Sequence, residues 1–259
     1  HISSCFGLYK LYMSSILKKI KKIVKKNVIF VCCSKGIEMN SLRLPSQIVA
    51  SYFPKHSIAV LSGPNFAEEV SRSMPAATLI ASNKMATSKK IASIVQTKLF
   101  RPYISDDVIG SQIAGATKNV YAIACGIVEG KKFGKNAVAS IISRSFAEVS
   151  RLNKSMKAKP ETLSGLSGMG DLFLTCSSKK SRNFRLGIDL AKGMTLNSII
   201  KKNSSIAEGV FTARALKQMS NKKKLNLPIA ETVYQILYRK KDIDYAIEAL
   251  GNPDEEKLT

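Results

Sequence analysis

The sequence predicts an α/β half with a mostly parallel sheet, followed by an all-helical half. Short continuous apolar runs alternate with helical patterns up to about residue 105, and long helical patterns without a clear strand fill the rest. Alternation of this kind is typical of parallel sheets whose strands are buried on both faces. The two halves predict domains over residues 1–105 and 106–259.

In the first half, residues 1–12 show no clear pattern, and the elements begin at Met13. Apolar stripes and runs predict, in order, a helix over Met13–Lys26, a strand over Asn27–Cys33, a helix over Pro45–Tyr52, a strand over Ser57–Leu61, a short helix ending near Val70, a strand over Ala77–Ala81, a helix over Ala86–Leu99 and a strand over Tyr103–Ser105. Ligands of such sheets bind beyond the carboxyl ends of the strands, where Ser34-Lys35-Gly36 and Ser62-Gly63-Pro64 lie.

In the second half, three- and four-residue apolar spacing predicts helices, and Pro228 suits the first position of one of them. The predicted ranges are 107–129, 135–152, 182–192, 195–201, 207–220, 228–238 and 242–250. The segment Gly165–Leu172, with three glycines before an acid, is predicted to be a loop.

Composition narrows the class of protein. The chain has 259 residues, of which 45% are hydrophobic, and no apolar run is long enough to span a membrane. No export signal is recognised near the N-terminus, so we expect a soluble, cytoplasmic protein. The five cysteines are odd in number and lack metal-ligand spacing, which favours reduced thiols and no metal site.

The net charge is +23, from 32 lysines and 9 arginines against 18 acidic residues. Such a charge attracts anionic partners. However, the lysines are spread along the chain, and no nucleic-acid-binding motif or interleaved aromatic residues accompany them. We therefore favour a solvated lysine-rich surface over specific nucleic-acid binding.

The stretch from Gly110 to Ala124 is the most informative part of the chain. It is an apolar helical pattern interrupted by one lysine, Lys118, between small residues such as Gly115 and Ala116. Small residues permit close approach of a backbone or a ligand, and a desolvated lysine can accept a proton. A lysine whose head group simply reaches the surface is the structural alternative.

Two further segments could carry chemistry. Asp171, after three glycines, could orient Lys118 or bind a substrate hydroxyl, or it could cap a helix. Ser181-Arg182-Asn183 begins a helical pattern, and a helix N-terminus beside a guanidinium suits a phosphate. Ordinary capping explains Ser181 but leaves Arg182 and Asn183 without a role.

Glu208 precedes another helix and could accept a hydrogen bond from a ribose hydroxyl, or simply favour the helix dipole. His1 and His56 have no metal-compatible neighbours, and we assign them no role.

Taken together, these motifs resemble the NAD(P)-dependent glycerol-3-phosphate dehydrogenases of the bacterial type over nearly all of residues 28–240. The six motifs that carry the resemblance are, in chain order, Ser34-Lys35-Gly36; Ser62-Gly63-Pro64 with Phe66-Ala67; Ala116 with Lys118-Asn119; Gly168 with Gly170-Asp171-Leu172; Thr175-Cys176 with Ser181-Arg182-Asn183; and Glu208-Gly209. Six motifs in the same order make a specific match.

The resemblance implies an α/β partial Rossmann domain followed by an all-α substrate-binding and catalytic domain. It implies a cytoplasmic, homodimeric enzyme that interconverts dihydroxyacetone phosphate and sn-glycerol 3-phosphate with NAD or NADP, for phospholipid synthesis. The implied catalytic residues are Lys118, Asp171 and Thr175; the implied substrate-binding residues are Lys35, Gly63, Lys118, Asp171, Ser181, Arg182 and Asn183; the implied cofactor-binding residues are Lys35, Ala67, Arg182, Ile206 and Glu208.

Two departures from the family pattern qualify this expectation. The sequence contains no Gly-x-Gly-x-x-Gly turn, on which the dinucleotide pyrophosphate rests in Rossmann domains, and Asn65 stands where Ser or Thr is usual. We therefore expect a chain that begins midway through the Rossmann domain, with weak nicotinamide binding and a tendency to aggregate through exposed strand edges. The alternative functions are an inactive helical dimerisation or binding module, and a charge-driven nucleic-acid-binding protein.

Overall fold

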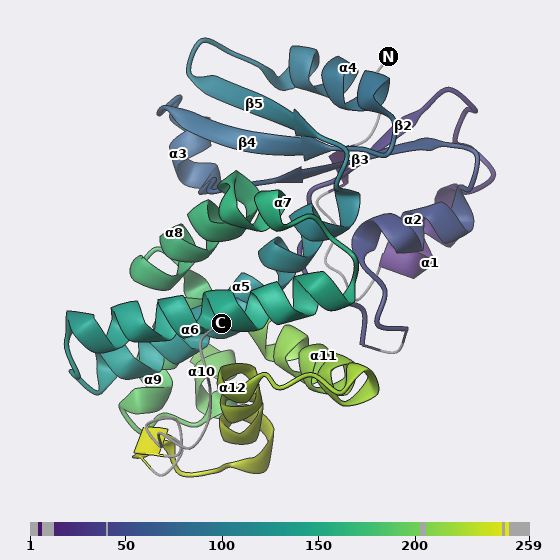
Figure 1. Cartoon of the computed structure of the whole chain (residues 1–259). Helices are drawn as coiled ribbons and strands as arrows, with labels where there is room; N and C mark the ends of the chain where they lie inside the picture. The colour runs from purple at the N-terminus through teal and green to yellow at the C-terminus, as the bar shows by residue number, and fades with distance from the viewer. Residues whose placement is uncertain (1–4, 7–12, 40, 203–205, 245–246, 249–259) are drawn as a thin grey trace. The chain divides into compact units, whose positions relative to one another are not determined.

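The computed structural model describes residues 5–6, 13–39, 41–202, 206–244 and 247–248. The chain forms two compact units, which we describe separately (Figure 1). The first unit consists of residues 1–116 and 156–171, and the second of residues 117–155 and 172–259. Among the described helices, none is long and apolar enough to cross a membrane.

The first unit is built on a five-stranded sheet with the order β1-β2-β3-β4-β5. The strands are β1 (Cys5–Phe6), β2 (Ile29–Cys32), β3 (Ser57–Ser62), β4 (Ala76–Ala81) and β5 (Phe100–Ser105). Neighbouring strands pair in parallel, with Ile29 opposite Ser57, except that β3 and β4 are antiparallel, with Val60 opposite Ala81. The predicted fold class, a mostly parallel α/β sheet followed by a helical part, is confirmed.

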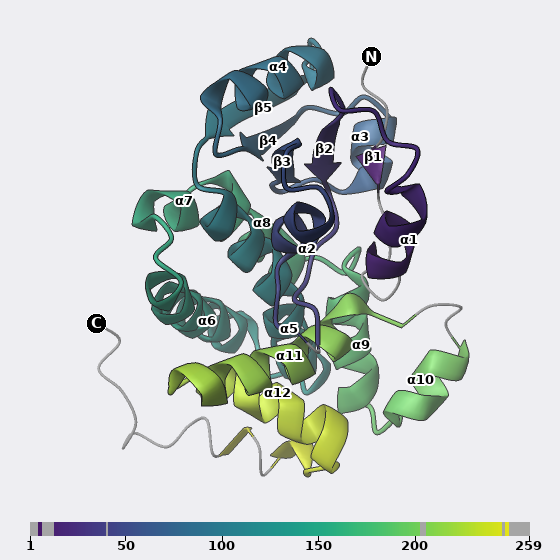
Figure 2. The ribbon, with the colours of Figure 1, turned by 90° about the vertical axis from the view of Figure 1, so that its right-hand side faces the viewer.

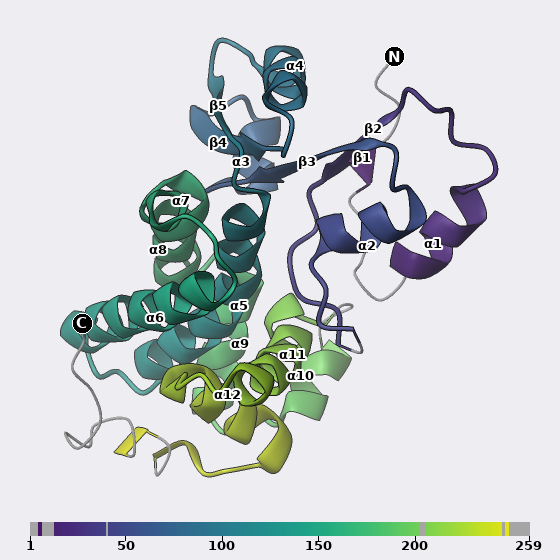
Figure 3. The same ribbon diagram turned by 45° about the vertical axis from the view of Figure 1, so that its right-hand side comes forward.

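Alternate residues of the strands pack against helices on opposite faces of this sheet. Phe30 and Val60 join one apolar cluster with α1 (Met13–Ile20) and α2 (Pro45–Tyr52). Val31, Ala59 and Ile80 join a second cluster with α4 (Met85–Val95). Figure 3 shows α4 on one side of the sheet and α1 and α2 on the other. Burial on both faces explains why the strands appear in the sequence as continuous apolar runs.

Two predicted helices are shorter in the structure. The helix predicted over Met13–Lys26 ends at Ile20. Lysines between positions 18 and 26 are spaced three and four residues apart, and no acidic residue lies among them, so their mutual repulsion disfavours a longer helix. The helix predicted over Ala86–Leu99 ends at Val95. There the Thr97 hydroxyl accepts hydrogen bonds from the N–H groups of Leu99 and Phe100, which forms a turn instead of another helical turn.

The segment from 160 to 177 differs most from its prediction. Gly165–Leu172 is not a loop, because α7 (Pro160–Ser164) is followed by a π-helical turn, η2 (Leu166–Gly170), and by α8 (Asp171–Ser177). A side chain at Gly168 would overlap the backbone of Leu163, so glycine permits this tight winding. The short α3 (Ala67–Ser71) lies where a short helix was predicted, whereas the helix predicted over 242–250 lies partly outside the described residues.

The second unit is helical. Its helices are the greater part of α5 (Val108–Gly130), α6 (Lys135–Ser155), α8 after its first residue, α9 (Arg182–Ala191), α10 (Leu196–Lys202), α11 (Glu208–Lys223) and α12 (Pro228–Arg239). Figure 2 shows α11 and α12 side by side. Helices α5 and α9 cross closely, because a Cβ at Gly126 would overlap the carbonyl oxygen of Phe184 and one at Gly187 would overlap that of Ile123.

Candidate functional site

In the first unit, a partly buried ion pair joins two of the predicted site residues. Lys35 follows β2, and its Nζ lies 2.6 Å from Oδ2 of Asp171, the first residue of α8. The side chain of Asp171 is 1% exposed and that of Lys35 is 24% exposed. A buried carboxylate is costly in free energy unless a positive charge pairs with it. Because Asp171 needs this partner, the ion pair fixes the position of the Lys35 ammonium.

Small residues bring other segments close to this pair. A Cβ at Gly115 would lie 3.0 Å from Ser62 Oγ and 3.7 Å from Lys35 Nζ, and one at Gly170 would lie 3.6 Å from Pro64 Cγ. Gly63 is equally confined, because its Cβ would lie 3.1 Å from the Cα of Thr78. The turn after β3, the beginning of α5 and the turn before α8 therefore meet around Lys35.

Ala67, a predicted cofactor residue, is the exposed first residue of α3. Its role stays a prediction.

In the second unit, Lys118 lies on α5 and is only 8% exposed. Its helical neighbours Thr117 and Asn119 are buried as well. Helix α8 packs at this point, because the Cys176 thiol lies 3.9 Å from the Lys118 carbonyl oxygen, and Thr175 beside it is buried. The structure thus places the predicted catalytic lysine and threonine on two helices in contact.

A hydrogen-bonded network extends from the residue after Lys118. The Asn183 side-chain amide donates to Asn119 Oδ1 at 3.0 Å, and Asn119 Nδ2 donates to Glu208 Oε2 at 3.2 Å. The Gly209 N–H donates to Asn183 Oδ1 at 2.9 Å. A side chain at Gly209 would press against the Asn119 carbonyl oxygen. The network therefore ties α5, α9 and α11 together, with Asn183 and Glu208 as fixed members.

Ser181 is the N-cap of α9, since its hydroxyl accepts a hydrogen bond from the Phe184 N–H at 3.3 Å. The capping interpretation of Ser181 is correct, and a role in phosphate binding stays a prediction for it. Asn183, one residue into the helix, points inward to Asn119, whereas Arg182 is exposed.

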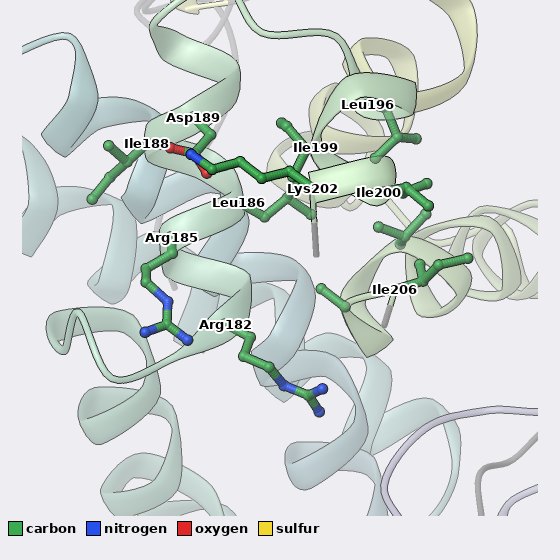
Figure 4. A pocket seen from close by; sticks show the side chains of 12 residues that line it. Arg182, Arg185, Leu186, Ile188, Asp189, Leu196, Ile199, Ile200, Lys202 and Ile206 are labelled. Atoms are coloured by element: carbon green, nitrogen blue, oxygen red, sulfur yellow. The ribbon is translucent and has the colours of Figure 1, made fainter. Parts of the chain in front are cut away.

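Arg182 lines a pocket of about 630 Å³ in the second unit (Figure 4). Arg185 and Lys202 add positive charge, Asp189 is the acidic lining residue, and Ile206 is among the aliphatic residues. Two predicted cofactor residues, Arg182 and Ile206, thus border one pocket, and Glu208 follows two residues later. Helix α9 begins at Arg182, so its N-terminal N–H groups lie beside this guanidinium, and the two together suit an anion.

The sequence interpretation assigned no role to Asn119, although the residue belongs to one of the motifs. A buried amide in an apolar helical pattern, next to the single lysine, is the signal that could have found it, because a buried amide needs hydrogen-bond partners.

Comparisons with known proteins show the family of this chain. Residues 6–88 match the family model of the NAD-dependent glycerol-3-phosphate dehydrogenase N-terminus, and residues 107–248 match that of the C-terminus. A glycerol-3-phosphate dehydrogenase [NAD(P)+] of Caulobacter vibrioides is 47% identical over 220 residues, which are 85% of this chain and 66% of that protein. The corresponding protein of Parvibaculum lavamentivorans is 42% identical over 239 residues, which are 92% of this chain and 72% of that protein.

The crystal structure of glycerol-3-phosphate dehydrogenase from Coxiella burnetii superimposes with a TM-score of 0.88 at 32% identity, covering 93% of this chain and 74% of that one. The chain thus spans about two thirds to three quarters of the length of these proteins. None of these relatives supports the alternative of an inactive helical module. The chain belongs to the NAD-dependent glycerol-3-phosphate dehydrogenase family, as its motifs predicted.

Proposed function

We propose that this chain interconverts dihydroxyacetone phosphate and sn-glycerol 3-phosphate with NAD or NADP. The proposal is supported by relatives that are named glycerol-3-phosphate dehydrogenase [NAD(P)+]. The observation that carries the proposal is the buried Lys118 on α5, followed directly by the network that fixes Asn183 and Glu208. A lysine held among buried residues is suited to exchange a proton with a carbonyl oxygen.

The residues of the second unit fit a dinucleotide. Arg182 offers a guanidinium to a phosphate at the edge of the pocket, Ile206 offers an apolar surface, and Glu208 offers a carboxylate that can accept from a ribose hydroxyl. We assign Lys35 and Ala67 in the first unit to the same cofactor. When bound, the nicotinamide supplies or accepts the hydride.

We assign the phosphate of the substrate to Ser181, Arg182 and Asn183 at the start of α9, where backbone N–H groups and a guanidinium favour an anion. We also assign Gly63, in the turn after β3, to the substrate; its lack of a side chain lets this turn pack against β4, since a Cβ there would lie 3.1 Å from the Cα of Thr78. The ion pair with Asp171 holds Lys35 so that its ammonium can meet a charged substrate.

In the reduction direction, the Lys118 ammonium donates a proton to the C2 oxygen as the hydride reaches C2. In the reverse direction, the neutral amine takes the hydroxyl proton. Thr175 and Asp171 would position the reacting groups. Proton transfer of this kind contributes about 10²- to 10⁴-fold in rate.

We further propose a homodimer in the cytoplasm that supplies glycerol phosphate for phospholipid synthesis. The domain boundary near residue 105 also stays a proposal, and it differs from the compact units, the first of which includes residues 106–116 and 156–171. Analytical ultracentrifugation tests the dimer, and limited proteolysis tests the boundary.

The activity is tested by following NADH and NADPH oxidation with dihydroxyacetone phosphate. We expect Lys118→Ala to lower kcat about 10²- to 10⁴-fold, whereas the control Lys192→Ala, an exposed lysine at the end of α9, leaves kcat unchanged. Equal activity of the Lys118→Ala variant, or no turnover by the unaltered chain with either cofactor, would contradict the proposal.

A further inference from the structure

Residues 18–26 form a strongly basic surface on the first unit. Six of these nine residues are lysines, and all six are exposed: Lys18, Lys19, Lys21, Lys22, Lys25 and Lys26. The first acidic residue in the sequence is Glu38, whose carboxylate hydrogen bonds to the hydroxyls of Ser14 and Ser41. Within the described part of the chain, no ion pair involves any of the six lysines.

This surface is held by the fold. Met13 and Leu17 of α1 are buried in the core of the first unit, and Ile20 and Val24 pack against the same cluster. The Lys25 carbonyl oxygen accepts from the Val28 N–H and lies 3.1 Å from Nε2 of His56. Helix α1 lies beside α2 (Figure 2). The apolar side of residues 13–24 is therefore occupied by the core, and the lysines between these apolar positions are exposed to solvent.

One apolar side chain lies among these lysines. Ile23 is 77% exposed, the highest value for a large apolar side chain in the described residues. It sits in the turn directly after α1, with Lys21 and Lys22 before it and Lys25 after Val24. An exposed apolar residue surrounded by positive charge is what an interfacial lipid contact requires.

We propose that residues 18–26 form a docking surface for an anionic lipid bilayer. Clusters of four to eight lysines bind the negative surface of a membrane as point charges. A nucleic acid is disfavoured, because the cluster has no arginine for bidentate phosphate contacts and no aromatic residue for base stacking. The residues of this surface take no part in the proposed catalysis.

The test is sedimentation of the full chain with vesicles of phosphatidylcholine, with or without phosphatidylglycerol. We expect binding only to the anionic vesicles, and its loss as salt rises from about 0.05 M to about 0.5 M. Each lysine near such a surface contributes roughly a factor of five to the partition coefficient. Lys19→Gln with Lys22→Gln and Lys26→Gln should thus lower the partition coefficient about a hundredfold.

A matched variant separates local from overall charge. Lys89→Gln, Lys90→Gln and Lys98→Gln together remove the same charge from exposed positions on and after α4. This triple variant should bind the anionic vesicles within about threefold of the unaltered chain, because its lysines lie outside the cluster.

A second pair of variants tests the apolar contact. Ile23→Ser should weaken binding about fivefold, because part of the side chain enters the interface. Ile94→Ser, a change at another exposed isoleucine (48% exposed), should not weaken it. Equal loss in the two triple variants, equal binding to neutral vesicles, or tighter binding to single-stranded DNA than to anionic vesicles at the same salt would overturn the proposal.

Discussion

At the scale of single residues, the Asn119 side chain hydrogen bonds both to Asn183, which we assign to the substrate phosphate, and to Glu208, which we assign to the dinucleotide ribose. It accepts from Asn183 and donates to Glu208. Asp at this position keeps the acceptor for Asn183 but places a carboxylate against the Glu208 carboxylate. We expect Asn119→Asp to raise KM for the dinucleotide about tenfold or more, because a hydrogen bond becomes a repulsion, with a smaller effect on KM for dihydroxyacetone phosphate.

The control for this prediction is a double variant that exchanges the donor and the acceptor of the hydrogen bond between positions 119 and 208. In the double variant with Glu208→Gln, the new amide can donate to the new carboxylate, so the bond is restored in the opposite direction. We expect the double variant to recover most of the lost dinucleotide affinity, measured as KM and by titration. A double variant as weak as Asn119→Asp would show that the contact with Glu208 does not position the cofactor group.

Lys35 and Asp171 illustrate what residue patterns could and could not predict. Both were identified from their motifs, but nothing in the sequence indicated that they pair across 136 positions. Periodicity describes the face on which a residue lies, whereas a long-range partner depends on how the elements pack. The hydrogen-bond partners of Asn119 could not be predicted for the same reason, since they lie 64 and 89 residues away.

At the scale of helices, the crossing of α5 and α9 depends on two glycines. A Cβ at Gly187 would overlap the Ile123 carbonyl oxygen and lie 2.8 Å from the Ile127 nitrogen. We therefore expect Gly187→Ala to destabilise the protein by about 1–3 kcal/mol through overpacking, although alanine is the better helix former. Urea unfolding followed by circular dichroism measures this loss.

The matched change is Gly165→Ala, where the new methyl group would lie 3.4 Å from the nearest backbone oxygen and φ is −89°. It should cost less than about 1 kcal/mol, because no atom has to move. Similar losses for the two variants would refute the idea that close packing at Gly187 limits the distance between the helices.

Elements with a strong local signal were predicted well. Pro45 at the first helical position and the apolar spacing behind it gave α2 its observed bounds of Pro45 to Tyr52. The turn from 166 to 170 was not predicted, because glycine-rich sequence normally signals a loop. Here it is the contact of Gly168 with Leu163 that makes helical winding possible.

At the scale of the whole molecule, stability should depend on the protonation of Glu148. This residue of α6 is 1% exposed, and burial raises the pKa of its carboxyl from 4.5 to about 7. Its oxygens accept from the N–H groups of Ile229 and Ala230 at the start of α12 and from the Tyr121 hydroxyl. These bonds and the Arg151 charge lower the pKa, but desolvation outweighs them.

The sign of the pH dependence follows from proton linkage. Between pH 4.5 and about 7 the Glu148 carboxyl is protonated in the folded protein and ionised in the unfolded chain. Its contribution to the free energy of unfolding is therefore complete below pH 4.5 and is lost as the pH rises through about 7. The free energy of unfolding should fall by about 3 kcal/mol over this range from this group alone. In Glu148→Gln the side chain stays neutral at every pH. The part of the pH dependence of the unfolding free energy that comes from this group should therefore vanish, even if the amide weakens the cap of α12. The measurement is urea unfolding of both proteins from pH 5 to pH 8, and parallel slopes would rule out Glu148 as the titrating group.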